Sequence, residues 1–262
     1  MNLGLTDKPV LVCASSAGLG RATAMEFARE GARVMLTARR EDELKRAVAE
    51  ITDATGNTPK YLVADLTKAA DVTRLVQSTT EAFGGLYTVV NNSGGPPAGT
   101  FERFDDAAWQ SAFELNLLSY IRVIRAAVPA MRAGGGGRIV NFTSSSVKSP
   151  IENLVLSNTF RTGVLGLSKT LAGELGPDGI LVNVLGPGRV QTERITQLDT
   201  GRAAKAGISI DQVRVNTSKT IPLGRYGVPD EYARVAVFLG SPANTYVTGQ
   251  TLLVDGGMVK AY

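Results

Sequence analysis

The sequence of 262 residues contains no histidine and a single cysteine, Cys13. A nucleophile activated by histidine, as in a Ser-His-Asp or Cys-His pair, is therefore excluded, and so is a zinc site with histidine ligands. One cysteine also excludes an intramolecular disulfide and a metal site built from several thiolates, so we expect no metal. Acid–base chemistry in this chain has to use carboxylates, lysine, tyrosine, water or the substrate itself.

Long hydrophobic segments and runs of like charge are absent as well. The sequence has no run of about 18 apolar residues that could cross a membrane. Residues 1–9 also lack the basic and apolar segments of a signal peptide. We therefore expect a cytoplasmic protein without a membrane partner. The net charge is +4, but basic residues lie among acidic ones, as in the Arg-Arg-Glu-Asp-Glu stretch at 39–43. We therefore do not expect nucleic-acid binding.

Short β-branched runs alternate with longer amphipathic stretches along the chain. The pattern predicts strands at 9–14, 33–37, 61–64, 87–91, 138–142, 180–185 and 251–254, and helices at 18–30, 41–54, 69–83, about 106–132, 155–175 and 229–239. Apolar strands alternating with helices indicate an α/β fold: one doubly wound parallel sheet of the Rossmann type, with helices on both faces. No linker divides residues 1–262, so we expect one domain with its ligand beyond the carboxyl ends of the strands.

The first predicted strand runs directly into a glycine-rich turn that opens a helix. The turn reads Cys13-Ala14-Ser15-Ser16-Ala17-Gly18-Leu19-Gly20. Gly18 and Gly20 allow the backbone to approach a pyrophosphate, whose charge the helix N-terminus stabilises. This arrangement predicts a dinucleotide-binding site.

The end of the second strand bears on which dinucleotide is bound. An NAD site favours an acidic residue there for the ribose hydroxyls, whereas an NADP site favours arginine for the 2′-phosphate. Here Arg39 and Arg40 occupy the position, and no acid precedes Glu41. We expect NADP(H) to be preferred over NAD(H).

Several motifs in order resemble the short-chain dehydrogenase/reductase family. They are the glycine-rich turn, Asp65, Asn91-Asn92-Ser93-Gly94, Asn116, and Pro187-Gly188 with Thr192, while the tail through Asp255-Gly256-Gly257 resembles 3-oxoacyl carrier-protein reductases. The resemblance implies hydride transfer between a nicotinamide and a carbonyl or alcohol, and a homo-oligomer (a dimer or tetramer) paired through the two longest helices. The cofactor contacts that we expect are Ala14, Ser15, Ser16, Gly18, Leu19, Gly20, Arg39, Arg40, Asp65, Leu66, Asn91, Asn92, Gly94, Arg161, Pro187, Gly188, Val190 and Thr192.

The turn departs from the family pattern at its start. Ala14 stands where the family has its first glycine, and Cys13 where it has threonine. If position 14 requires a positive φ, the Cβ of alanine costs about 1 kcal/mol there.

The catalytic positions depart further. In the family a serine polarises the carbonyl, a tyrosine 13 residues later moves the proton, and a lysine four residues after the tyrosine shares its helix face. Ser144 matches the serine and Asn116 the asparagine that holds a relay water, but the other two positions fall on Ser157 and Arg161. A serine hydroxyl is a far weaker acid than a phenol, and arginine does not readily release a proton.

The sequence therefore does not identify a single proton donor. Ser157 relaying through water near Asn116, Lys148, Glu152 and the substrate itself all remain candidates. Two hypotheses follow: an NADP(H)-dependent oxidoreductase acting on a small carbonyl or secondary alcohol with an atypical proton donor, or a catalytically impaired NADP(H)-binding sensor, scaffold or partner subunit. Residues 189–220 have weak periodicity and fall where the family keeps a variable substrate lid.

Overall fold

A single parallel sheet organises the protein. The computed structural model describes residues 1–261 and places seven strands in the order β3-β2-β1-β4-β5-β6-β7, with every neighbouring pair parallel. The strands are β1 (Pro9–Val12), β2 (Arg33–Ala38), β3 (Lys60–Val63), β4 (Thr88–Asn91), β5 (Gly137–Phe142), β6 (Ile180–Pro187) and β7 (Thr251–Val254). The strand order reverses between β1 and β4. The predicted doubly wound sheet is confirmed.

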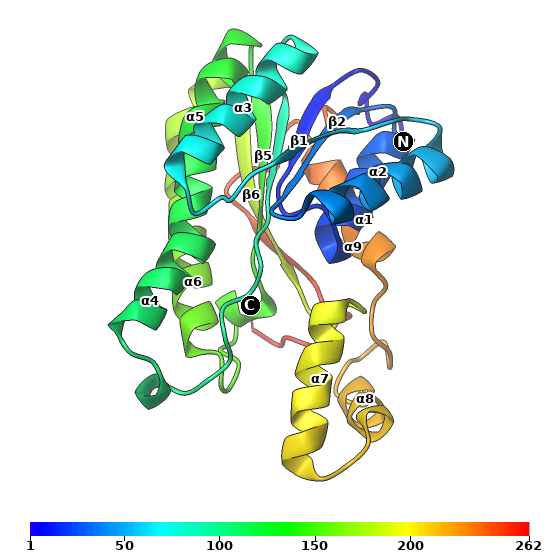
Figure 1. Ribbon diagram of the computed structural model, residues 1–262, viewed down its shortest axis with the longest axis vertical. Coiled ribbons are helices and arrows are strands. Elements are labelled where there is room, and N and C mark those ends of the chain that lie inside the picture. The colour runs from blue at the N-terminus through cyan, green and yellow to red at the C-terminus, as the bar shows by residue number, and fades with distance from the viewer. Residues whose placement is uncertain (262) are drawn as a thin grey trace.

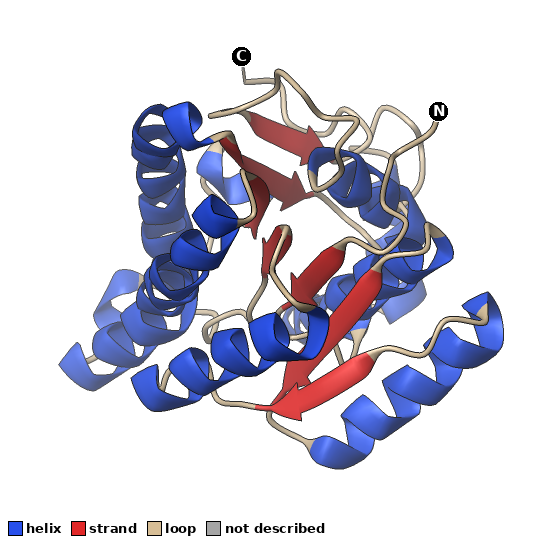
Figure 2. Ribbon diagram, turned by 90° about the horizontal axis from the view of Figure 1, so that it is seen from above, coloured by secondary structure: helices blue, strands red, loops and turns tan. Residues whose placement is uncertain are grey.

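Helices cover both faces of this sheet, as Figures 1 and 2 show. One face carries α1 (Gly18–Arg29), α2 (Glu41–Thr55) and α9 (Pro229–Leu239), and the other carries α3 (Ala69–Phe83), α5 (Ser119–Ala133) and α6 (Val155–Leu175). Each face has its own buried core. Phe27, Leu44 and Tyr232 belong to the first core, and Leu75 and Met131 to the second. Within residues 1–261, no helix has both the length and the apolar character that crossing a membrane requires.

The predicted helix at 106–132 contains a local change of winding. It consists of α4 (Asp106–Phe113), a π-helical turn (Glu114–Leu118) and α5 in uninterrupted succession. Asp105 begins α4 by accepting a hydrogen bond from the Ala108 N–H at 2.9 Å. A π turn inserts an extra residue into a helix and is frequent at functional sites. Here it contains Asn116, which is fully buried.

The segment at 189–220, whose pattern is too weak to predict an element, forms two helices. These are α7 (Glu193–Ala206) and α8 (Ile210–Ser218), which pack on each other and project below the sheet in Figure 1. Thr192 caps α7 and Ser209 caps α8 through their side-chain oxygens. The two helices bury only Asp199, Ala203 and Val213, which explains why no clear apolar stripe marks them.

A buried carboxylate joins this helix pair to the rest of the protein. Asp199 is fully buried and accepts hydrogen bonds from the Tyr226 hydroxyl at 3.0 Å and from the Arg189 guanidinium at 3.4 Å. Burial and the nearby charge of Arg202 lower the pKa of Arg189, against the opposing effect of Asp199. An uncompensated charge at this depth is costly, so Asp199 and Arg189 depend on each other.

Replacing Asp199 by alanine is expected to destabilise the protein by about 3 kcal/mol, because it leaves the Arg189 side chain, only 11% exposed, without an acidic partner. Chemical denaturation measures the loss. The matched control is Asp178→Ala, which removes an exposed ion pair with Arg132 and should cost at most about 1 kcal/mol. Equal losses for the two variants would contradict this account of the α7 anchor.

Candidate active site

The turn between β1 and α1 is held by hydrogen bonds to both neighbouring strand ends. Ala14 has a φ of +46°, so position 14 does adopt the positive φ at which the Cβ of alanine is unfavourable. The Ser15 N–H donates to the Thr37 carbonyl at 3.0 Å, and the Thr37 N–H donates to the Ser15 hydroxyl at the same distance. These two bonds fasten the turn to β2. Asn92, which follows β4, donates to the Ala14 carbonyl at 3.2 Å and fastens it on the other side.

Gly20 is the position at which this turn accepts no side chain. A Cβ there would lie 2.3 Å from the Ala14 carbonyl oxygen and 2.8 Å from the Asn92 amide nitrogen. The helix α1 begins at Gly18, and no side chain caps it. Its first-turn N–H groups are therefore available to an anion, which the helix dipole also favours.

The arginines at the end of β2 have different environments. Both are exposed, but Arg40 forms an ion pair with Glu43 in the first turn of α2. The hydrogen bond and charge of Glu43 raise the pKa of Arg40 above its usual value. Glu43 also accepts a hydrogen bond from the Ser16 hydroxyl at 3.2 Å. Sequence reasoning missed Glu43, because 27 residues separate it from Ser16.

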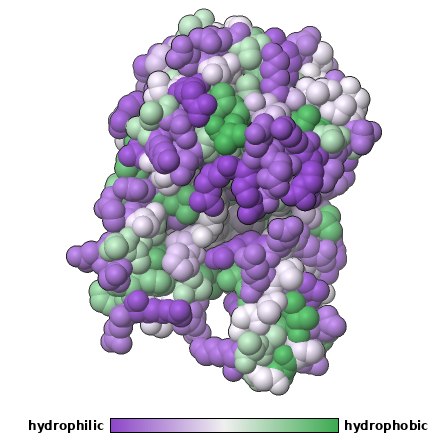
Figure 3. All heavy atoms as spheres, viewed as in Figure 1, coloured by the Kyte–Doolittle hydropathy of each residue, from purple (hydrophilic) through white to green (hydrophobic). Residues whose placement is uncertain are grey.

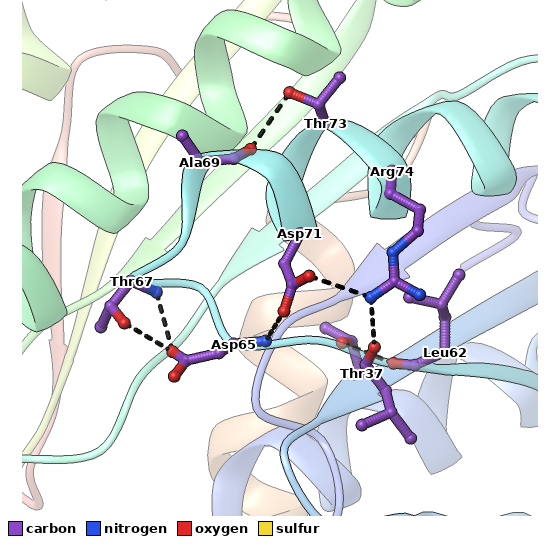
Figure 4. Close-up of polar contacts among 9 residues, drawn as sticks. Thr37, Leu62, Asp65, Thr67, Ala69, Asp71, Thr73 and Arg74 are labelled. Carbon is purple, nitrogen blue, oxygen red and sulfur yellow. Dashed lines mark hydrogen bonds and ion pairs between the residues drawn. The ribbon is translucent and has the colours of Figure 1, made fainter.

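Asp65 is fixed at the end of β3 by its own neighbours, as Figure 4 shows. One oxygen of its carboxylate accepts from the Thr67 N–H at 3.0 Å and from the Thr67 hydroxyl at 2.8 Å, while its N–H donates to Asp71. Partial burial opposes ionisation, but the Thr67 hydrogen bonds and the charges of Arg39 and Lys68 lower the pKa of the Asp65 carboxyl. Asp65, one of the expected cofactor contacts, is thus an oriented carboxylate, and Leu66 follows it, partly buried.

Two asparagines, one at the end of β4 and one in the π turn, form hydrogen bonds that link separate elements near the site. Asn91 donates to the Asn141 side chain at 2.8 Å and so links β4 to β5. Asn116 donates to the Ser93 hydroxyl at 2.9 Å and to the Gly94 carbonyl at 2.8 Å. The Asn116 side-chain oxygen (Oδ1) is buried and accepts no hydrogen bond within residues 1–261. A buried polar atom of this kind usually accepts from a water molecule or a ligand.

Three predicted catalytic residues lie around the end of β5. Ser144 follows the strand, and its hydroxyl oxygen accepts from the Ser146 N–H at 3.1 Å, which starts a short 3₁₀ helix (Ser145–Val147) packed against α6. Ser157 and Arg161 lie one turn apart on α6, each only 7% exposed. The Arg161 guanidinium donates to the Phe142 carbonyl at 3.3 Å and forms no ion pair with any residue in 1–261.

Tyr120 is a neighbour of Arg161 that sequence reasoning also missed. Its hydroxyl donates to the same Phe142 carbonyl at 2.8 Å, so a phenol and a guanidinium meet at one oxygen. Burial raises the pKa of Tyr120, although the charge of Arg161 opposes the shift. The phenol therefore stays protonated at neutral pH. The sequence signal that could have indicated Tyr120 is its position four residues, about one helical turn, after Asn116.

The other two candidate proton donors lie in the loop before α6. Glu152 is exposed, and so is Lys148 at the end of the 3₁₀ helix. Both are thus close in sequence to the β5 end, but neither is buried as Ser157 is. No group of three or more acidic or cysteine side chains in the described part of the chain is arranged to hold a metal ion.

The segment after β6 returns to the glycine-rich turn. Gly188 packs so closely on Asp255 that a Cβ would lie 2.5 Å from the Asp255 Cβ, and Val190 is buried beside Gly227. Gly18 and Thr192 both line a cavity of about 730 Å³ between α1 and α7–α9. A Cβ on Gly18 would lie 3.8 Å from the Thr192 side chain. The space-filling view shows the molecule hollowed between the α7–α8 pair and the sheet domain (Figure 3).

The site therefore has an oriented turn at the β1–β4 switch point, an oriented carboxylate after β3, and a polar cluster after β5. This is the arrangement of a dinucleotide-dependent oxidoreductase. The chain belongs to the short-chain dehydrogenase/reductase family: residues 13–259 match the family described as enoyl-(acyl carrier protein) reductase.

Known relatives cover the full length of the protein. The chain is 32% identical to the 3-oxoacyl-[acyl-carrier-protein] reductase of Chlamydia muridarum, over 98% of this chain and 100% of that protein. Among solved structures, L-sorbose reductase from Gluconobacter frateurii, complexed with NADPH and L-sorbose, has a TM-score of 0.95, 32% identity and complete coverage of both chains. Actinorhodin polyketide ketoreductase with NADPH has a TM-score of 0.92 and 30% identity, covering 97% of this chain and 98% of that one.

Gly20→Ala should destabilise the protein by about 1–3 kcal/mol, because the new Cβ overlaps the Ala14 carbonyl oxygen and the backbone must shift. The displaced turn should also weaken NADPH binding at least about tenfold, measured by titration of nucleotide fluorescence. The matched control is Gly201→Ala in α7, where a Cβ meets nothing within 4 Å. A Gly20→Ala protein as stable as the wild type would show that this close approach does not constrain the turn.

Proposed function

We propose that the protein is an NADP(H)-dependent oxidoreductase that transfers hydride between the nicotinamide and a small carbonyl compound or secondary alcohol, with an atypical proton donor. The observation that carries the proposal is the side-chain-free cradle at Gly20 beside the uncapped start of α1, with Arg39 and Arg40 at the next strand end. The solved relatives that contain NADPH support the same cofactor. We propose further that α7 and α8 form the substrate lid and that the protein is a homo-oligomer.

The described residues fit this cofactor. The start of α1, with Ala14, Ser15 and Leu19, would hold the pyrophosphate, and Ser16, Arg39 and Arg40 would hold the 2′-phosphate. The remaining contacts would come from Asp65 and Leu66 at the adenine, from Asn91, Asn92, Gly94 and Arg161 along the riboses, and from Pro187, Gly188, Val190 and Thr192 at the nicotinamide. The bound nicotinamide supplies the hydride.

The chain itself would polarise the carbonyl and move the proton. Ser144 would donate its hydroxyl proton into a hydrogen bond with the substrate oxygen, and the positive charge of Arg161 would stabilise negative charge developing there. Ser157 would pass a proton to the substrate oxygen and take one from a water molecule that would be bound at the unsatisfied side-chain oxygen of Asn116. Lys148 and Glu152 are the alternative sources, from the loop before α6.

A proton relayed through serine and water is transferred less efficiently than one donated directly by a positioned phenol. Loss of a general acid typically slows a reaction about 10²–10⁴-fold. Orientation of cofactor and substrate supplies more than this, so slow turnover remains compatible with the site. The competing proposal is an NADP(H)-binding sensor, scaffold or partner subunit, which the pairing of Ser157 with Arg161 in place of the family tyrosine and lysine favours.

Steady-state oxidation of NADPH, followed by its absorbance with a panel of ketones, aldehydes and 3-oxoacyl thioesters, separates the two proposals. We expect turnover with at least one carbonyl class, reduced by about 10²–10⁴-fold relative to an enzyme with a positioned acid. Tight NADPH binding without turnover on any member of the panel would contradict the oxidoreductase and leave the sensor or scaffold.

Arg39→Ala should weaken NADPH binding about tenfold, because a guanidinium contact to the 2′-phosphate is lost, and should leave NADH binding unchanged. Titration of both nucleotides measures the effect. Arg46→Ala is the control for a general change in charge, since Arg46 is exposed on α2 and pairs with Asp42. Equal affinity of the wild type for NADH and NADPH would contradict the cofactor preference.

A further inference from the structure

One carboxylate occupies the place where the predicted 2′-phosphate ligands converge. The Glu43 side chain is 22% exposed and uses both oxygens: one accepts from the Ser16 hydroxyl at 3.2 Å and the other from the Arg40 guanidinium. Ser16 and Arg40 are two of the three residues that the proposed function assigns to the phosphate. The Glu43 carboxylate therefore accepts hydrogen bonds from two donors, Ser16 and Arg40, that a bound phosphate would need.

The other acids in the first turn of α2 do not share this position. Glu41 pairs with Lys45 and accepts a hydrogen bond from Tyr61, while Asp42 pairs with Arg46 on the exposed side of the helix. Only Glu43 among these three reaches across to the turn that follows β1. The contact is thus a property of this side chain and does not come from the acidic helix start as a whole.

The two dinucleotides would meet this carboxylate in opposite ways. A 2′-phosphate is an anion, so it is repelled by Glu43 and must take over the Ser16 and Arg40 donors. A free 2′-hydroxyl is a hydrogen-bond donor, and a carboxylate at this strand end is the group that accepts it in NAD sites. One residue therefore opposes the phosphate and suits the hydroxyl.

We propose that Glu43 is a specificity-determining residue whose carboxylate holds the 2′-phosphate subsite closed and so limits the preference of this protein for NADP(H). The inference rests on the proposed function, since it takes Ser16 and Arg40 as phosphate ligands. Binding of the 2′-phosphate moves Glu43 off both residues, whereas binding of the 2′-hydroxyl leaves it in place as an acceptor.

Calorimetric titration with adenosine 2′,5′-bisphosphate and with adenosine 5′-phosphate tests this without requiring turnover. Glu43→Gln should raise the affinity for the bisphosphate about tenfold, because a negative charge beside the phosphate is removed, and should leave the affinity for the monophosphate equal or lower. The matched control is Asp42→Asn, which removes the same charge one residue away from the contact. It should change the ratio of the two affinities less than about twofold, the range that long-range, screened charge allows.

The possible outcomes separate this inference from the proposed function. Suppose that the wild type prefers the bisphosphate and that the ratio of the two affinities is unchanged in Glu43→Gln, or shifts equally in Asp42→Asn. This result would overturn the role of Glu43 and leave the proposed function in place. A wild type without preference, in which Glu43→Gln creates one, supports Glu43 and contradicts the NADP(H) preference. No binding of either nucleotide to a folded protein overturns both.

Discussion

The close packing of the β1–α1 turn is the constraint on which the rest of the site depends. Ala14 adopts a positive φ, its carbonyl oxygen approaches Gly20, and hydrogen bonds tie the turn to β2 at Thr37 and to Asn92 after β4. Three strand ends are thereby held in register at the point where the strand order reverses. The unfavourable φ of Ala14, about 1 kcal/mol, is small beside the packing that fixes it.

A second constraint lies at the end of β5, where the chemistry would take place. Arg161 is buried without an acidic partner in residues 1–261, and it donates to the Phe142 carbonyl oxygen, which also accepts from the Tyr120 hydroxyl. A buried cation that lacks an anion is costly, and such groups are typical of functional sites. The unsatisfied side-chain oxygen of Asn116 lies in the neighbouring π turn. We interpret the unpaired charge of Arg161 and the unsatisfied side-chain oxygen of Asn116 as groups that a bound ligand would satisfy.

The sequence predicts the fold well because its information is local. Apolar runs, glycine ends and amphipathic periodicity mark all seven strands and the six predicted helical stretches without reference to distant residues. The α7–α8 pair is not predictable in this way, because its anchor is the polar group Asp199 and its buried apolar surface is small. The π turn around Asn116 is likewise invisible, since it changes hydrogen bonding without changing the apolar pattern.

Only those residues of the candidate site that lie in recognisable motifs are predictable from the sequence. Spacing from the glycine-rich turn identifies Gly18, Gly20 and the two arginines, but it cannot reveal that Glu43 spans the gap to Ser16. It also cannot reveal that Tyr120 and Arg161 meet at the Phe142 carbonyl, because they come from different helices. These contacts depend on how side chains from separate elements converge.

A crystal structure of the complex with NADPH would show directly where the nicotinamide lies. We expect the pyrophosphate at the start of α1, with the nicotinamide between Thr192 and the end of β5 and its reactive C4 carbon facing the hydroxyls of Ser144 and Ser157. A nicotinamide that lies away from these serines, or a nucleotide bound outside the β1–β4 switch point, would contradict this expectation.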